Sequence, residues 1–367
     1  MKPTSEDLSY MEMAFSLARK ARGRTSPNPC VGAVIVKDGR IVGWGYHQEA
    51  GQPHAEIIAL ERAGKKAQGA TLYLTLEPCV HWGRTPPCAD RLVRAGFKRA
   101  VIASTDPNPV VHSKGVSRLK EAGVEVTCGL LAEKNSELNE AYNKYIVKRT
   151  PFVTLKFAVS LDGKMATFSG DSHWISSPES RQLVHHLRFE NDAVLVGIGT
   201  VLKDNPLLTV RLESVQKKKW LRVILDTRLR IPPESRLLQQ PENGRVMIFC
   251  GPEAPEEKIK ALQDKGAEVI LTETENGKIK LKEVLKTLGQ REVTALLVEG
   301  GSKVLTSFLE ERLADKVIAF ISPRLIGGET AATPFEGQGV EKLAEALELK
   351  NIKHLRLKHD IIIEGYL

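Results

Sequence analysis

The sequence predicts a two-domain α/β protein, and three observations lead to this fold class. The chain has 367 residues, which exceeds a typical single domain and allows two hydrophobic cores. Strand-like and helix-like segments alternate through both halves, as is typical of α/β layers. A helical stretch at residues 138–149 ends just before Pro151, and a proline disfavours a helical residue before it. We therefore expect the domains to span residues 1–149 and 150–367.

The first half is predicted to begin with a helix, two strands and a helix. Apolar residues recur at helical spacing between Leu8 and Ala18. Runs rich in strand formers flank Lys-Asp-Gly at 37–39, which predicts a hairpin. The next helix should end at Gly64, since glycine terminates helices well. The remaining strands are expected at 71–78, 99–104 and 124–129, and the remaining helices at 88–96, 115–123 and 138–149. This order predicts a largely parallel sheet begun by a hairpin.

The second half is predicted to form another α/β domain, because strand-like and helix-like segments alternate there too. Its strands are expected at 152–163, 221–227, 246–250, 295–301 and 316–322. Its helices are expected at 177–188, 256–266, 279–289 and 302–313.

Composition limits the class of protein. No apolar run approaches the length of a membrane span, and the N-terminus lacks the apolar core and cleavage site of a secretory signal. We therefore expect a cytoplasmic protein with no membrane partner. The five cysteines are odd in number and scattered, which argues against a disulfide framework and leaves metal binding or burial for each.

The positive charge is concentrated in the first domain. Residues 1–150 hold 22 Lys and Arg against 15 Asp and Glu, a net +7, which leaves +1 of the total +8 for the rest. Such a domain favours an anionic partner, either nucleic acid or a phosphorylated small molecule, although a solvated surface would also carry this charge.

Three side chains in the first domain form a candidate zinc site. His54 opens a helix, Cys79 follows a strand and Cys88 opens the next helix. One imidazole and two thiolates suit a tetrahedral zinc whose fourth position holds water, as catalytic zinc requires. Each could instead be an ordinary buried side chain, but their order and placement favour the metal.

Glu56, two residues after His54, is predicted to be the general acid/base outside the zinc shell. H-x-E followed by P-C-x-x-C is the signature of zinc nucleobase deaminases. Here eight residues separate the two cysteines instead of two. The insert is expected to form a compact loop that puts His81 and Arg84 near the metal.

The motifs together resemble one family. TSPNPCVGAVIV, HAEIIAL, TLEPCVHWGRTPPC and TDPNP are similar to the deaminase half of the bifunctional riboflavin-biosynthesis deaminase–reductase. LKFAVSLDGKMA, WISSPES, GTVLKDNPLLTVR and VEGG are similar to its reductase half. The resemblance implies a cytidine-deaminase-like three-layer domain followed by a dihydrofolate-reductase-like α/β domain. It also implies a homo-oligomer.

The resemblance implies two successive reactions on a phosphorylated pyrimidine. Zinc-dependent deamination of a diaminopyrimidine ribosyl phosphate is followed by NADPH-dependent reduction of the ribosyl chain to ribityl. By position, Asn28 and His47 would hold the ring. Ribose or phosphate contacts would come from His81, Arg84, Asp106 and Asn108. Asn28, Asp106 and Asn108 could instead serve turns, and His47 could pack under the hairpin.

The reductase half is harder to interpret from its residues. Glu299-Gly300-Gly301-Ser302 follows a strand and opens a helix, so its N–H groups could receive a dinucleotide phosphate, or it could be an ordinary turn. The resemblance implies NADPH contacts from Ala158, Trp174, Thr200, Asp204, Gly300, Gly301 and Ser302. It implies substrate contacts from Lys156, Ser172, Arg188, Leu208, Arg211 and Glu299. Arg188 and Arg211 suit a phosphate, with surface salt bridges as the alternative, and Lys156 is the candidate proton donor.

Two other functions compete with this interpretation. A nucleic-acid deaminase, for example of tRNA adenosine, fused to an unrelated domain would suit the basic charge, but we find no basic patch interleaved with aromatic residues. We therefore expect no nucleic-acid partner. A structural zinc module would close the fourth position with a protein ligand, and Glu56 is poorly spaced for that.

Overall fold

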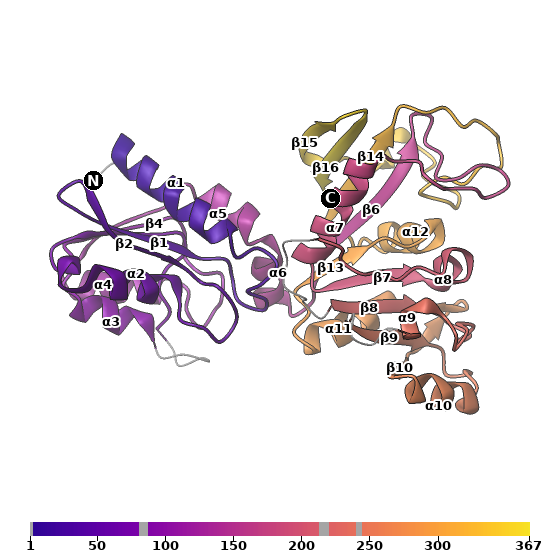
Figure 1. Ribbon diagram of the computed structural model, residues 1–367, viewed down its shortest axis with the longest axis horizontal. Coiled ribbons are helices and arrows are strands. Elements are labelled where there is room, and N and C mark those ends of the chain that lie inside the picture. The colour runs from indigo at the N-terminus through magenta and orange to yellow at the C-terminus, as the bar shows by residue number, and fades with distance from the viewer. Residues whose placement is uncertain (1–2, 81–86, 213–219, 240–243) are drawn as a thin grey trace. The chain divides into compact units, whose positions relative to one another are not determined.

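The computed structural model describes residues 3–80, 87–212, 220–239 and 244–367. The chain separates into two compact units, Met1–Arg149 and Thr150–Leu367 (Figure 1). No helix among the described residues is long and apolar enough to cross a membrane.

Unit 1 is built on a five-stranded sheet with the order β2-β1-β3-β4-β5. Its strands are β1 (Gly32–Lys37), β2 (Arg40–Tyr46), β3 (Thr71–Leu74), β4 (Arg99–Ile102) and β5 (Glu125–Cys128). Its helices are α1 (Ser5–Arg19), α2 (Ala55–Ala63), η1 (Gly64–Ala67), α3 (Cys88–Arg94), α4 (Lys114–Glu121), α5 (Ala132–Leu138) and α6 (Glu140–Lys148).

The two faces of this sheet carry different helices, which gives three layers. Alternate strand residues point to opposite faces. Val34 packs with Met11 and Phe15 of α1, whereas Ile35 packs with Ala59 of α2 in a core shared with α3 and α4. Figure 1 shows α1 and α5 on one side of the strands and α2, α3 and α4 on the other. The three-layer α/β fold class is confirmed.

Unit 1 corrects the expectation of a largely parallel sheet. β1 is antiparallel to both β2 and β3, and only β3, β4 and β5 run parallel. The reason is that α2 carries the chain from β2 over β1, so β3 pairs with the first strand of the hairpin. The predicted end of α2 is confirmed, because Gly64 follows it with φ of 54°, a conformation that favours glycine.

Unit 2 is built on a nine-stranded sheet with the order β10-β9-β8-β7-β13-β6-β14-β16-β15. Its strands are β6 (Phe152–Ser160), β7 (Ala193–Gly197), β8 (Trp220–Leu225), β9 (Gly244–Cys250), β10 (Ala267–Leu271), β13 (Ala295–Val298), β14 (Lys316–Ser322), β15 (Lys350–Leu357) and β16 (Asp360–Tyr366), with β11 (Thr274–Glu275) and β12 (Lys278–Ile279) as a separate pair. Its helices are α7 (Pro178–Glu190), α8 (Ile198–Asp204), α9 (Arg236–Gln239), α10 (Glu256–Asp264), α11 (Leu281–Gln290), α12 (Ser302–Glu310) and η3 (Leu343–Glu345).

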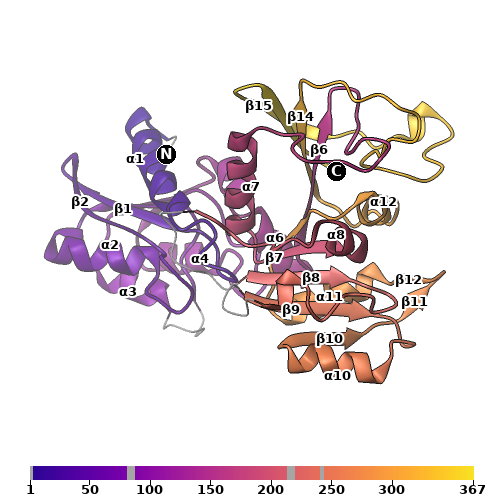
Figure 2. The same ribbon diagram turned by 45° about the vertical axis from the view of Figure 1, so that its right-hand side comes forward.

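This sheet is parallel from β10 to β14 and ends in an antiparallel hairpin of β16 and β15. Figure 2 shows the hairpin at one edge and β10 at the other. Four strands of this sheet, β7, β10, β15 and β16, were not predicted from the sequence. β15 is exposed over seven of its eight residues, so it lacks the alternating apolar pattern that predicts a half-buried strand.

Candidate functional site

The structure brings the three predicted zinc ligands together in unit 1. His54 caps the N-terminus of α2, Cys88 is the first residue of α3, and Cys79 lies in the loop after β3. The His54 Nδ1 atom lies 3.2 Å from the Cys88 Sγ and 3.7 Å from the Cys79 Sγ. Ligand atoms on one tetrahedral zinc are about 3.6 Å apart, given Zn–S and Zn–N bond lengths. The geometry therefore fits one zinc ion.

These three residues form the one such metal-ligand group found in the part of the chain that the structure describes. Hydrogen bonds from the Cys88 thiol and from His54, together with the Cys88 N–H at 3.4 Å, lower the pKa of Cys79 to about 4 against the opposing effect of burial. Thiolate is the form of cysteine that binds a metal, so the donor set is suited to a dication.

Glu56 lies beside the three ligands on the first turn of α2. Its Oε1 atom is 3.9 Å from the His54 Nδ1, and only 3% of the residue is exposed. Burial raises the pKa of Glu56, and the neighbouring His54 opposes that shift. A carboxyl group with raised proton affinity at this point can both accept and return a proton.

His47 lies next to the ligand His54 and contacts Asn28. The His47 Nδ1 faces the Pro53 carbonyl at 3.2 Å, which can only accept, so Nδ1 carries the proton. The His47 Nε2 therefore accepts from the Asn28 amide at 3.0 Å. The His47 ring meets the His54 ring edge-on, with centroids 5.3 Å apart. Burial lowers the pKa of His47, consistent with a neutral ring that orients Asn28.

Asp106 and Asn108 are engaged in their own turn. The Asp106 carboxylate accepts from the Tyr142 hydroxyl at 2.9 Å and from the Asn108 N–H at 2.8 Å. The Asn108 Oδ1 accepts from the Val110 N–H at 3.1 Å. These contacts fit the alternative in which Asp106 and Asn108 stabilise a turn. His81 and Arg84 lie outside the described residues.

Glu77 is a buried residue that the sequence analysis did not single out. Its Oε1 accepts from the N–H groups of Asp106 and Ser113, at 2.8 and 2.7 Å. Its Oε2 accepts from the N–H groups of Gly115 and Val116, at 2.9 and 3.2 Å. Glu77 thus joins the Cys79 loop to the start of α4. The sequence signal was weak, because a glutamate before Pro-Cys does not show which amides it will meet.

A cavity of about 510 Å³ and one of about 680 Å³ lie in unit 2. The larger opens at the carboxyl ends of parallel strands β7, β8 and β13, where ligands bind in open α/β sheets. Six residues predicted for cofactor or substrate line it: Ser172, Thr200, Asp204, Glu299, Gly301 and Ser302. Lys203, Arg230, Lys278 and Lys303 also line it and were missed, because isolated cations in loops and helices carry no sequence motif.

Glycines bring the backbone of this cavity together. A Cβ atom on Gly300 would lie 3.0 Å from the Gly197 nitrogen and 3.1 Å from the Val196 Cα. The Thr200 hydroxyl accepts from the Gly301 N–H at 3.1 Å, which ties the start of α8 to the start of α12. Both helix N-termini therefore face the cavity, as binding of a dinucleotide phosphate requires.

Glu299 is surrounded by two cations. Arg188 donates to the two Glu299 oxygens from Nε and from a terminal nitrogen, at 2.5 and 2.9 Å, and the Lys156 Nζ is 4.0 Å from Oε2. A third guanidinium nitrogen of Arg188 donates to the Thr209 carbonyl at 3.0 Å, and a role for Arg188 at a phosphate stays a prediction. Burial lowers the pKa of Lys156, and Glu299 opposes that shift.

The remaining predicted residues lie outside the lining of the larger cavity. Arg211 donates from its backbone to the His185 ring at 3.3 Å. Trp174 is 59% exposed, with the Arg181 guanidinium 4.1 Å from its ring centroid. Ala158 lies on β6 and Leu208 is buried. The structure does not gather these four with the cofactor residues.

Two family models match this chain. Residues 4–104 match the cytidine and deoxycytidylate deaminase zinc-binding region. Residues 151–363 match the RibD C-terminal domain. The two matches fall on units 1 and 2, respectively.

Relatives match over nearly the whole chain. It is 46% identical to the riboflavin biosynthesis protein RibD of Aquifex aeolicus, covering 97% of each chain. It is 39% identical to RibD of Escherichia coli, covering 95% of this chain and 97% of that one.

Solved structures also match over nearly the whole chain. One form of Acinetobacter baumannii RibD superposes with a TM-score of 0.87 at 40% identity, covering 98% of each chain. A Thermotoga maritima protein described as a diaminohydroxyphosphoribosylaminopyrimidine deaminase/5-amino-6-(5-phosphoribosylamino)uracil reductase superposes with a TM-score of 0.85 at 39% identity, again covering 98% of each chain.

Because these matches include both halves, they do not favour a nucleic-acid deaminase fused to an unrelated domain. The chain belongs to the RibD family and is a bifunctional enzyme of riboflavin biosynthesis, with a zinc-binding deaminase domain and an NADPH-dependent reductase domain.

Proposed function

We propose that unit 1 deaminates 2,5-diamino-6-(5-phosphoribosylamino)pyrimidin-4(3H)-one and that unit 2 then reduces the ribosyl chain of the product to ribityl. The observation that carries the first step is the convergence of His54, Cys79 and Cys88 with the buried Glu56. The activity described for the Thermotoga relative supports both steps.

In unit 1, His54, Cys79 and Cys88 hold the zinc ion. When bound, zinc supplies a water of lowered pKa. Glu56 takes a proton from the attacking water and delivers protons to the ring nitrogen and the departing ammonia. Asn28, held by His47 at 3.0 Å, positions the ring, and the net +7 of residues 1–150 attracts the phosphorylated substrate.

In unit 2, Thr200, Gly301 and Ser302 of the larger cavity would hold the phosphates of NADPH. The cofactor supplies the hydride, and the protein orients the two reactants. Lys156 is the proton donor. It lies 4.0 Å from Glu299, which lines the same cavity.

We also propose a homo-oligomer in a reducing, cytoplasmic compartment, acting on a small molecule and not on nucleic acid. Free Cys79 and Cys88 persist as metal ligands where disulfides are rare. The exposed edge strand β15, with Ile352 and Leu355 at 60% and 52% exposure, supports pairing with a second copy.

Ammonia release and NADPH oxidation from the diaminopyrimidine substrate test the proposal. We expect ammonia without NADPH, and NADPH consumption only after deamination. Ammonia without any NADPH oxidation would remove the reductase assignment. If zinc-loaded protein gives neither ammonia release nor NADPH oxidation, the substrate assignment is wrong.

A further inference from the structure

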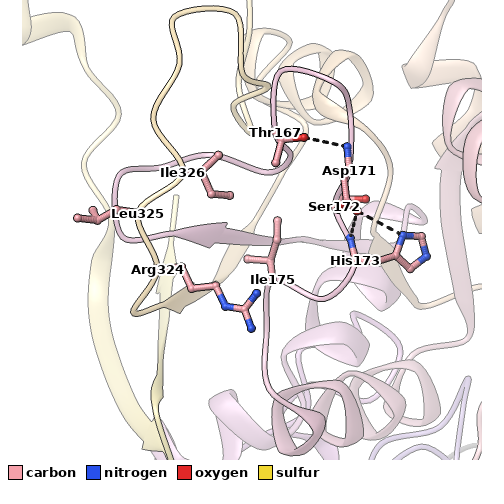
Figure 3. A pocket seen from close by; sticks show the side chains of 8 residues that line it. All are labelled: Thr167, Asp171, Ser172, His173, Ile175, Arg324, Leu325 and Ile326. Atoms are coloured by element: carbon pink, nitrogen blue, oxygen red, sulfur yellow. Dashed lines mark hydrogen bonds and ion pairs between the residues drawn. The ribbon is translucent and has the colours of Figure 1, made fainter.

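The smaller cavity of unit 2 lies apart from the residues assigned above, except for one. Its volume is about 510 Å³, and it is lined by Thr167, Asp171, Ser172, His173, Ile175, Arg324, Leu325 and Ile326 (Figure 3). Ser172 lines both this cavity and the larger one that holds the cofactor residues. A ligand that passes Ser172 would therefore reach from one cavity into the other.

The wall made by residues 324–326 is fixed to the loop that follows β6. The Leu161 N–H donates to the Arg324 carbonyl at 2.8 Å. The Asp162 carboxylate accepts from the Ile326 N–H at 3.0 Å and from the Gly327 N–H at 2.7 Å. β6 and β14 are parallel neighbours, so this wall stands at their carboxyl ends, where ligands bind in open α/β sheets.

The opposite wall is a hydrogen-bonded loop. The Thr167 N–H donates to the Asp171 carbonyl at 2.9 Å, and the Asp171 N–H donates to the Thr167 hydroxyl at 3.1 Å. The Asp171 Oδ1 accepts from the His173 N–H at 3.0 Å. The cavity therefore lies between two segments that are each held in place by hydrogen bonds.

Two polar groups on these walls keep hydrogen-bonding capacity. Among the described residues, the Arg324 guanidinium has no hydrogen-bond or ion-pair partner, and the Asp171 Oδ2 accepts no hydrogen bond. Ile175, Leu325 and Ile326 are the large apolar residues of the lining, and the Leu325 side chain points away from Asp171 (Figure 3). The cavity thus offers planar donors on one side, an acceptor on the other and apolar contacts in between.

We propose that this cavity binds the pyrimidine ring of the reductase substrate. The inference rests on the proposed function of unit 2. The deaminated ring presents carbonyl oxygens, which suit the Arg324 donors, and N–H and amino groups, which suit the Asp171 carboxylate. Its flat faces suit Ile175 and Ile326. The ribosyl chain then passes Ser172 toward Glu299 and Lys156.

Two other parts of the reactants fit the cavity less well. A phosphate would meet one guanidinium and would also face the Asp171 carboxylate, whereas phosphate sites gather several donors. The adenine of the cofactor carries no carbonyl oxygen for Arg324.

The test compares Arg324→Leu with Arg324→Lys and with Arg245→Leu, which replaces an exposed arginine on β9 that lines neither cavity. The ligands are the deaminated substrate, ribose 5-phosphate (sugar phosphate without the ring) and 5-amino-6-ribitylaminouracil (ring and chain without phosphate). Arg324→Leu removes a hydrogen bond donated by a charged group. We therefore expect the KM for substrate and the Ki of the ribitylaminouracil to rise about tenfold or more. The KM for NADPH and the Ki of ribose 5-phosphate should stay unchanged. Arg324→Lys should recover part of the loss, and Arg245→Leu should behave as the parent protein.

Three outcomes would overturn the inference. A matching rise in the Ki of ribose 5-phosphate would make the cavity a phosphate site. A rise in the KM for NADPH would assign it to the cofactor. Unchanged constants for all ligands would show that the ring binds elsewhere. The unaltered protein is measured in the same assays. If it does not oxidise NADPH, the proposed function of unit 2 is wrong, and the result does not test ring binding in the smaller cavity. Ammonia release reports that unit 1 of each variant is intact.

Discussion

Arg188 and Glu299 lie 111 residues apart in the sequence, yet their side chains form a two-pronged ion pair with distances of 2.5 and 2.9 Å. Both side chains are nearly buried, at 15% and 8% exposure. Lys156 approaches the same carboxylate at 4.0 Å, so the three groups carry one surplus positive charge. Each was expected to face the substrate, and the fold makes them face one another as well.

Glu299→Gln should lower both stability and NADPH oxidation. Without the carboxylate, Arg188 and Lys156 are nearly buried cations with no counter-charge, and breaking such a pair costs about 3–5 kcal/mol. We expect a lower Tm and at least a tenfold loss of reductase rate, with ammonia release retained. Thermal unfolding of Glu299→Gln, Arg188→Met and the double variant forms a cycle. If the stability lost by the double variant equals the sum of the losses of the two single variants, the pair does not stabilise the fold.

Lys156→Met should remove the high-pH limb of the reductase rate. A proton donor loses activity as pH rises through its pKa. Burial places the pKa of Lys156 below 10.5, with Glu299 opposing the shift and Arg188 adding to it. The parent rate should therefore fall with rising pH below 10.5, and the residual rate of Lys156→Met should be flat there. A limb that persists in the variant would assign proton donation to another group.

Glu56→Gln should abolish deamination and keep zinc. The amide fits the same buried space but cannot accept the water proton, so we expect ammonia release to fall by roughly a hundredfold or more. Zinc content and NADPH oxidation on already deaminated substrate serve as controls. Retained ammonia release would instead indicate a structural zinc site.

Removal of zinc should separate the two activities. A chelator should stop ammonia release, because His54, Cys79 and Cys88 then hold no ion, and added zinc should restore it. NADPH oxidation on deaminated substrate should continue, since the described residues of unit 2 contain no comparable ligand cluster. Equal loss of both activities under the chelator would contradict independent sites.

Glu77→Gln should weaken zinc binding although Glu77 is not a ligand. Four N–H groups donate to its buried carboxylate, and an amide replaces one acceptor oxygen with a donor. We expect about 2–3 kcal/mol lower stability of unit 1 and a roughly tenfold lower zinc affinity. Thermal unfolding and competition with a chelator measure the two effects.

Asp7→Asn provides the matched control for Glu77→Gln. Asp7 is equally buried in unit 1 and accepts from Arg99 at 2.7 Å and from the Tyr73 hydroxyl at 2.8 Å, but it lies far along the chain from the zinc ligands. Asp7→Asn should lower the Tm without a change in zinc affinity. Equal loss of zinc affinity in both variants would mean that Glu77 acts only through overall stability.

The sequence by itself determined the chemistry that the chain can perform. His54, Glu56, Cys79 and Cys88 could be selected in advance because helix starts and strand ends are local features, and because residue type limits the metal that a site takes. Most elements of unit 1 followed from local periodicity in the same way, including the end of α2 at Gly64.

Only the tertiary structure decided how distant segments satisfy one another. The antiparallel pairing of β1 with β3, the four amides around Glu77 and the pairing of Arg188 with Glu299 all join segments far apart in the chain. A sequence shows which side chains can donate, accept or carry charge. Which of them meet depends on the non-local packing that brings their backbones together, and this packing leaves no local pattern to identify.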